Sequence, residues 1–431
     1  MNGIAPVGDE ATHRGRANGH VAPVSPPARR PPAAAWRIIA FSSVAMTMTV
    51  FGQTPGVSVF VDPVSRELGL TRSEISSVYS LATLVAALFL PWMGRRIDRH
   101  GVRQVALVVA GVFGLVVVGL AFAQGLAWVA VGFFGIRLLG QGTLSLAART
   151  IVAIRFRSGL GRAVAISGAI AAVGMSIVPL ALAALITASS WRATWILGGL
   201  SIWLVVIPLS HWFLRPGDDR PIADEVHPAE PTATDQWTRR RAVRSPIFWL
   251  VTLVGASVAM ILTGLSFHQI SILGEAGLSP TAAAANYVPQ TIAAVAAITI
   301  VGPLSERIPA RFLIVASMGL LAAGTGLVFV LALPWAPLAY AIALGGALGS
   351  SQALEGTLYP RFFGVRAIAA IRGAAFTITI AAAALGPVVV GLVHDATGTY
   401  EVAALLLIGI PIAIGVSALL IPEPSPAPEP R

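Results

Sequence analysis

The stretch Gly94-Arg95-Arg96-Ile97-Asp98-Arg99-His100-Gly101-Val102-Arg103 is a dense charged turn between two long apolar runs. A weaker copy, Gly302-Pro303-Leu304-Ser305-Glu306-Arg307-Ile308-Pro309-Ala310-Arg311, lies in the second half of the chain. In both, a Gly is followed by an acidic residue and an Arg, and then by a further Arg at the same spacing. A charged turn that recurs in this way indicates an internal duplication.

The composition is that of a membrane protein. Of 431 residues, 56% are hydrophobic and 11% are charged, whereas soluble proteins carry roughly 25% charged residues. All 29 basic residues are Arg, and the formal net charge is +10. Such an excess can indicate nucleic-acid binding, but these Arg residues lie between apolar segments, so we expect membrane lipids and no nucleic acid around the chain. The absence of Cys and the scattered His residues predict no metal and no cofactor.

Hydropathy predicts an all-α integral membrane protein with twelve transmembrane helices in two pseudo-symmetric six-helix bundles. The bundles are expected at 36–213 and 247–421, joined by a cytoplasmic linker at 214–246. The Pro-rich ends, 1–35 and 422–431, are expected to be disordered, solvated tails. The predicted helices are 37–61, 74–94, 104–124, 126–150, 162–188, 192–213, 247–273, 282–303, 311–333, 335–358, 367–394 and 399–421.

A second internal similarity supports the duplication and sets the orientation. The run from Arg155 to Gly168 is similar to the run from Arg361 to Gly373. Most Arg residues fall in loops on one side, so both termini are expected to be cytoplasmic, in a bacterial-type inner membrane. Parallel repeats of this kind place the substrate site near the midplane between the halves.

These motifs resemble those of a known transporter family. The 94–103 turn resembles the loop between helices 2 and 3 of the major facilitator superfamily, and the run from Arg137 to Gly142 resembles its helix-4 motif. The segments 51–57, 156–168, 268–269 and 371–373 are most similar to bacterial members of the monocarboxylate or oxalate/formate branch. The acidic-Gly-Gly start of helix 1 and the drug-antiporter helix-5 motif are both absent.

The resemblance implies a gate at the charged turns. In the family, such a turn forms ion pairs that hold the cytoplasmic side closed, although it also anchors topology. Gly101 is expected to permit the tight turn. The gating residues implied in this way are Gly94, Asp98, Arg99, Gly101 and Arg103 in the first copy, and Glu306 and Arg307 in the second.

Arg137 is the first candidate for substrate binding. It lies about ten residues, or roughly 15 Å, into the fourth helix, where a charge is costly unless it is paired. It could bind a substrate anion or take part in proton coupling, since a guanidinium binds a carboxylate bidentately, or it could simply hold backbone carbonyls. Arg372 in the opposite half could share the anion or reach the cytoplasmic interface instead.

Neutral polar groups at membrane depth could shape the substrate site or merely bond between helices. Gln53 stands in Gly52-Gln53-Thr54-Pro55-Gly56, where Pro is expected to break the first helix. Proton coupling could involve Arg137, Glu355 and His268, although His268 could instead be an interfacial residue and Glu355 could pair with an Arg. The glycines at 345, 346 and 349 are expected at close helix contacts. The predicted substrate-site residues are Arg137, Arg372, Gln53, Tyr79, Gln141, Tyr287 and Gln290.

The sequence therefore predicts a monomeric secondary transporter and not an enzyme. The expected cargo is a small, monocarboxylate-like organic anion, moved with protons by alternating access between the halves. The alternative is a proton-driven exporter of a hydrophobic compound or drug. A membrane enzyme is disfavoured because no cluster of catalytic carboxylate, His or Ser residues stands out, and a sensor is disfavoured by the short linker.

Overall fold

The computed structural model describes residues 3, 32–156, 159–215, 217–218, 238–364 and 368–421, with backbone alone at 32–34, 239 and 369. Every regular element in these residues is helical. The tail at 422–431, nearly all of the tail at 1–35 and most of the linker lie outside the described residues.

Within the described residues, the first half contains six membrane-length helical units. Two of them are built from consecutive pieces, at 35–68 and 126–155. The elements are α1 Pro32–Met48, η1 Thr49–Gly52, α2 Thr54–Leu68, α3 Arg72–His100, α4 Val102–Leu120, α5 Leu126–Ile136, η2 Arg137–Leu144, α6 Ser145–Arg155, α7 Leu160–Ala188 and α8 Trp191–Phe213.

The second half begins with a short helix in the linker, α9 Arg239–Val243, which hydropathy did not predict. Six further units follow in the described residues, and each overlaps one of the predicted helices. Their elements are α10 Pro246–Phe267, α11 Gln269–Glu275, α12 Pro280–Ala285, α13 Tyr287–Leu304, α14 Ala310–Gly326, η3 Leu327–Val330, α15 Ala336–Phe363, α16 Ile368–Thr397 and α17 Tyr400–Leu420.

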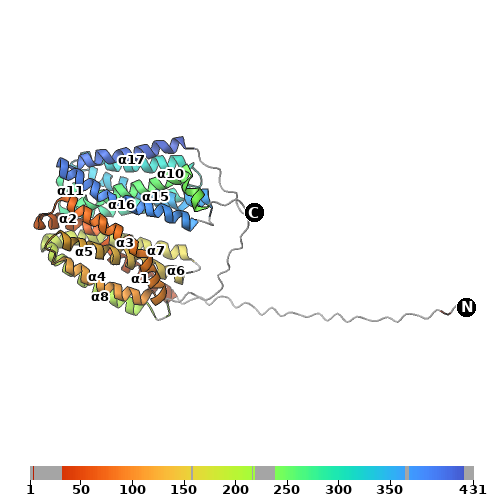
Figure 1. Ribbon diagram of the computed structural model, residues 1–431, viewed down its shortest axis with the longest axis horizontal. Helices are drawn as coiled ribbons and strands as arrows, with labels where there is room; N and C mark the ends of the chain where they lie inside the picture. Colours follow the sequence, from red (N-terminus) through yellow and green to blue (C-terminus); the bar gives the residue numbers. More distant parts are fainter. Residues whose placement is uncertain are drawn as a thin grey trace.

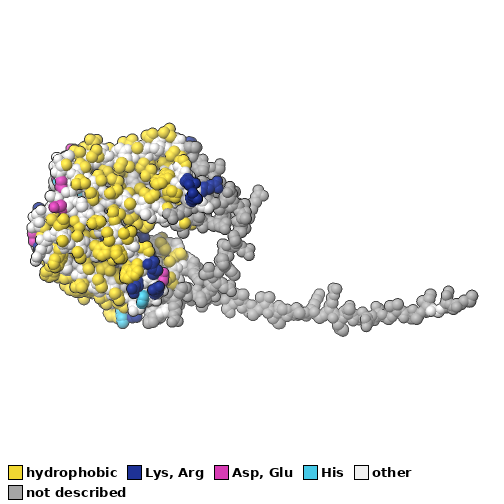
Figure 2. All heavy atoms as spheres, viewed as in Figure 1, with side chains coloured by type: hydrophobic (Ala, Val, Ile, Leu, Met, Phe, Trp, Pro, Cys, Tyr) yellow, Lys and Arg dark blue, Asp and Glu magenta, His cyan; other side chains and the backbone are white. Residues whose placement is uncertain are grey.

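The outer surface of the bundle is suited to lipid. Within the described residues, eleven helical segments are long and apolar enough to cross a membrane, and α15, with 28 residues, is also long enough to cross one. Large apolar side chains such as Leu88, Val131 and Leu204 are mostly exposed. Figure 2 shows a hydrophobic face, with Arg side chains gathered at one end of each half and acidic side chains at the other. The protein is therefore an all-helical integral membrane protein.

The two halves form two layers that meet at one end (Figure 1). Within the halves, α4 packs on α8, α13 on α15, and α10 on α16. Between the halves, α3 packs on α16, α2 on α10 and α11, and α7 on α12 and α13. We call the end with α11 and the start of α3 the closed end, and the opposite end, which carries the 94–103 and 302–311 turns, the Arg-rich end.

The duplicated motifs occupy equivalent places in the two halves. The 94–103 turn joins α3 to α4, and the 302–311 turn joins α13 to α14. Gly101 has φ of 81°, a conformation that glycine adopts readily, so it ends α3 and starts α4 as expected. Most of this charged turn is helical, because α3 continues through Asp98 to His100. The first unit continues past its predicted end at 61 to Leu68, and the left-handed Gly69, with φ of 65°, then ends it.

Candidate functional site

Arg137 is buried at the junction of the broken first unit and the fourth unit. Its side chain is 6% exposed. Nη1 donates to the Gly52 carbonyl at 3.0 Å and to the Tyr79 hydroxyl at 2.9 Å. The guanidinium also lies over the Tyr79 ring, 4.9 Å from its centroid, in a cation–π contact. Three spans of the first half therefore fix the position of this charge.

The break in the first unit makes this contact possible. The backbone at Gln53 is extended, with φ of −93° and ψ of 153°, and Pro55 stands at the start of α2. A Pro lacks the N–H that continues a helix, so carbonyls before it are left without helical partners. One of these, the Gly52 carbonyl, accepts from Arg137. The predicted break at 52–56 is therefore present.

Close backbone contact between the two units also requires Gly52 itself. A Cβ at this position would lie 2.2 Å from the carbonyl oxygen of Ile136 and 3.0 Å from the amide nitrogen of Gln141. Arg137 opens η2, an eight-residue stretch of π-helix. Such wide turns interrupt α-helices frequently at functional sites, and this one was not predicted from the sequence.

Tyr79 connects Arg137 to the second half. Its hydroxyl shares a hydrogen bond of 2.8 Å with Thr54, and because it accepts from Arg137, it can donate to Thr54. Its ring meets Phe133 edge to face, with centroids 5.7 Å apart, and packs against Phe267 of the second half at 4.5 Å. The residue that accepts from the buried guanidinium is therefore also in direct contact with the second half.

The charge of Arg137 has no acidic partner among the described residues. Its buried Nε atom has no hydrogen bond to any of them, and both acceptors of Nη1 are uncharged. A buried cation without an ion pair is costly. The described residues therefore leave the guanidinium with neutral acceptors and no counter-charge.

The remaining predicted polar residues lie on both halves, and among the described residues Tyr287 is the one of them that forms a hydrogen bond to the opposite half. Gln53 is half-buried, and its Nε2 donates to Thr49 at 3.3 Å. Tyr287 bridges the halves, since its hydroxyl donates to the Ser266 carbonyl at 2.8 Å and lies 2.9 Å from the Ser58 hydroxyl. Gln141 is half-buried on η2 and Gln290 is buried on α13.

Arg372 and Glu355 line a separate cavity in the second half. The cavity has a volume of about 290 Å³ and is also lined by Tyr359 and Thr379. Arg372 lies near the start of α16, towards the Arg-rich end, and shares none of the contacts of Arg137. Glu355 is half-buried against Gly255, where a Cβ would collide with Oε1. Arg372 was predicted to bind substrate and Glu355 to couple protons, and the structure places both side chains in one cavity.

His268 is fully buried at the closed end and is not at the lipid interface. Its Nε2 lies 3.2 Å from the Ser76 hydroxyl of the first half and 3.2 Å from the Pro387 carbonyl, and Nδ1 lies 3.5 Å from the Tyr400 hydroxyl. These contacts place it between the halves. The interfacial alternative for this residue is therefore wrong.

The predicted gating residues all lie at the Arg-rich end. Asp98, Arg99, Glu306 and Arg307 are exposed and form no ion pair with any residue that the structure describes. Arg103 lies 3.1 Å from the Nδ1 atom of His211 on α8. Gly94 has open space where a Cβ would stand. A gate of ion pairs at these turns stays a prediction, and it belongs to a state in which this end is closed.

Sequence reasoning missed the residues that join the two halves at the closed end. Asp62 pairs with Arg72 and accepts from Ser271 of the second half. Asp395 of α16 accepts from the amides of Arg72 and Ser73. No local motif marks these partners, although the spacing Thr71-x-x-Glu74 is a capping-box signal for the start of α3.

Comparison with known proteins identifies the family. A family model described as Major Facilitator Superfamily matches residues 37–379. The chain belongs to the major facilitator superfamily. It is accordingly a secondary transporter of a small molecule and not an enzyme. No curated protein matches the chain.

Solved structures share the fold. A bacterial homologue of the human lysosomal transporter Spinster, in an inward-facing and occupied conformation, is similar with a TM-score of 0.69 and 15% identity, over 90% of this chain and 97% of that one. The nucleoside transporter NupG is similar with a TM-score of 0.70 and 12% identity, over 90% of this chain and 98% of that one. At these identities the likeness concerns the fold alone. It favours no particular branch of the superfamily.

Proposed function

We propose that this transporter moves a small, monocarboxylate-like organic anion together with protons, and that Arg137 binds the anion. The observation that carries the proposal is the buried guanidinium without an acidic partner among the described residues, bonded only to Gly52 and Tyr79. An anion arriving between the halves would gain a desolvated, bidentate donor there. The motifs that resemble the monocarboxylate branch favour the same class of cargo.

The orientation in the membrane follows from charge. Arg side chains gather at the Arg-rich end, and loops rich in Arg stay on the cytoplasmic side of membranes. We therefore propose that this end and both termini face the cytoplasm of a bacterial-type inner membrane. The cavity of Glu355 and Arg372 then lies on the cytoplasmic route.

The test is uptake of pooled radiolabelled small carboxylates into proteoliposomes, with and without an inward proton gradient. We expect accumulation that depends on the gradient and collapses with a protonophore. Carboxylate flux that is equal with and without the gradient would support an organic anion as the substrate and exclude proton coupling. Absence of carboxylate flux in either orientation, together with saturable export of lipophilic compounds, would replace the proposal with a drug exporter.

Glu355 is the proposed proton carrier, because it is a half-buried carboxylate in the same cavity as Arg372. Glu355→Gln is expected to abolish gradient-driven accumulation while substrate exchange across the membrane continues, since the amide mimics the protonated acid. Accumulation and exchange are measured in the same proteoliposomes. Glu401→Gln, at an exposed acid of α17, is the control, and accumulation that survives Glu355→Gln would assign the proton to another group.

Tyr79 is proposed as a positioning residue for Arg137. Tyr79→Phe keeps the ring under the guanidinium but removes the hydroxyl that Arg137 and Thr54 share. The loss of a hydrogen bond to a charged group is expected to raise the KM for the anion about tenfold or more. Tyr340→Phe is the matched control, because the buried Tyr340 hydroxyl has no hydrogen-bond partner among the described residues. Equal KM values for the two variants would remove Tyr79 from the site.

A further inference from the structure

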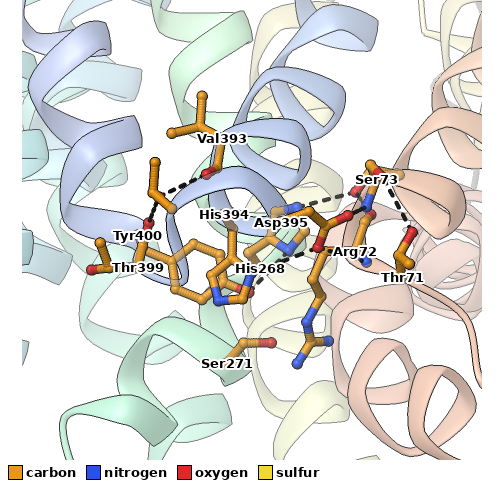
Figure 3. A network of polar contacts seen from close by, with 12 residues as sticks. Thr71, Arg72, Ser73, His268, Ser271, Val393, His394, Asp395, Thr399 and Tyr400 are labelled. Carbon is orange, nitrogen blue, oxygen red and sulfur yellow. Dashed lines mark hydrogen bonds and ion pairs between the residues drawn. The ribbon is translucent and has the colours of Figure 1, made fainter.

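The closed end is held by a helix cap that is divided between the two halves. The first amides of a helix have no acceptor within the helix itself. At the start of α3, Thr71 of the same half accepts from the Glu74 amide and Glu74 accepts from the Thr71 amide. The amides of Arg72 and Ser73 instead donate to Asp395 of the second half, at 3.2 and 2.7 Å. Figure 3 shows Asp395 at the end of α16 facing Arg72 and Ser73.

The position of Asp395 suits a contact that is made and broken. A carboxylate at a helix N-terminus is favoured by the helix dipole and by two charge-assisted hydrogen bonds. Both Arg72 and Ser73 are near the surface, so water can replace Asp395 when the halves separate. A cap of this kind stabilises the contact between the halves and can still exchange with water.

The backbones of α3 and α16 also touch at one turn behind this cap. A Cβ on Gly391 would lie 2.9 Å from the Arg72 carbonyl oxygen and 2.8 Å from the Ser76 hydroxyl oxygen. Any side chain at this position would push α16 away from α3. Ser76 in turn donates to the Arg72 carbonyl and lies against the buried His268 of the second half.

Two neighbouring polar contacts surround the cap. On one side, Asp62 pairs with Arg72 and accepts from Ser271 across the interface. On the other side, His394 lies 3.1 Å from Glu275 within the second half. Of these groups, only Asp395 gives both carboxylate oxygens to the backbone of the opposite half.

We propose that Asp395 is the latch of the closed end: its carboxylate caps α3 while the halves are together at this end, and its release accompanies opening there. Gly391 is the contact point that lets α16 come close enough for the latch to form. The latch concerns the conformational equilibrium alone, so it holds or fails independently of the proposed anion and proton.

The test measures exposure of a site behind the latch. The chain contains no Cys, so Ser76→Cys provides a single thiol at a position that is fully buried between the halves. Purified full-length protein in detergent is labelled with a water-soluble maleimide. Adding Asp395→Asn is expected to raise the labelling rate about tenfold, as expected for the loss of a charge-assisted hydrogen bond.

The matched control is Glu401→Gln, which removes an exposed acid from the first turn of α17 at the same end but within one half. It is expected to leave the labelling rate unchanged. Gly391→Val is a second route to the open state and is expected to raise the rate at least as much as Asp395→Asn. Folding of each variant is judged by a single peak in gel filtration. If Asp395→Asn fails this criterion, the labelling rate of Gly391→Val is used instead. Labelling at the parent rate in whichever of these variants folds would overturn the latch.

Discussion

Arg137→Gln is expected to reduce transport of every organic anion about a hundredfold, the upper range for loss of a hydrogen-bonded charge. Gln keeps a neutral amide donor on a shorter side chain. It cannot supply the positive charge or the second pair of donors that a carboxylate needs. The initial rate of labelled anion uptake into proteoliposomes measures the effect.

A second substitution at the same position separates charge from geometry. Arg137→Lys retains the cation but has no planar fork for bidentate binding. If the guanidinium binds a carboxylate, Arg137→Lys should transport the anion faster than Arg137→Gln, with a higher KM than the parent protein. If Arg137 only holds the Gly52 carbonyl and the Tyr79 hydroxyl, both variants should lose stability, and anion affinity in the folded fraction should not change.

The matched control is Arg66→Gln on α2. Arg66 is exposed, and its Nε donates to the carbonyl of Asp62 in its own helix. The same loss of charge is therefore made away from the buried site. Transport of all tested anions at the parent rate by Arg137→Gln would remove the proposed anion site.

The membrane-spanning units were predictable because burial in lipid depends on composition over about 20 residues. The span that forms α15 was predicted on the same grounds, although its Ser, Gly and Glu residues lower its hydropathy and it is not among the eleven most apolar described segments. The break at Gln53 could also be predicted, because Pro acts on the backbone that immediately precedes it. The π-helix that begins at Arg137 could not be predicted, because no local pattern in the sequence marks such a wider turn.

Individual residues of the candidate site could be chosen from the sequence, but the contacts between them could not be predicted. Arg137 stood out because a lone charge at membrane depth needs a reason. Its contacts with Gly52 and Tyr79 depend on how three spans pack, which no local pattern encodes. The same holds for the cap of α3 by Asp395, which joins residues more than 300 positions apart. The position of Arg372 along its helix could be predicted from the sequence, but the cavity that it shares with Glu355 could not.

Gly345→Val is expected to destabilise the folded protein by about 3 kcal/mol, at the upper end of the usual cost of overpacking. A Cβ at Gly345 would lie 2.0 Å from the Gln290 carbonyl oxygen, and one at Gly349 would lie 2.0 Å from that of Ala294. Helices in lipid associate through such close approach of small residues, because apolar burial gives no net drive between them. The backbones of α13 and α15 would have to separate.

The control for this substitution lies on the same helix. A Cβ at Gly356 would meet none of the described atoms within 4 Å, so Gly356→Val changes the helix propensity of α15 equally and leaves the packing intact. Thermal unfolding in detergent, followed by tryptophan fluorescence, should show a lower midpoint for Gly345→Val than for Gly356→Val. Equal midpoints would mean that α13 can move aside at no cost. Gly345 lies against the backbone of Gln290, a predicted substrate-site residue. The folded fraction of Gly345→Val should therefore also transport more slowly than Gly356→Val, because a shift of α13 would displace Gln290.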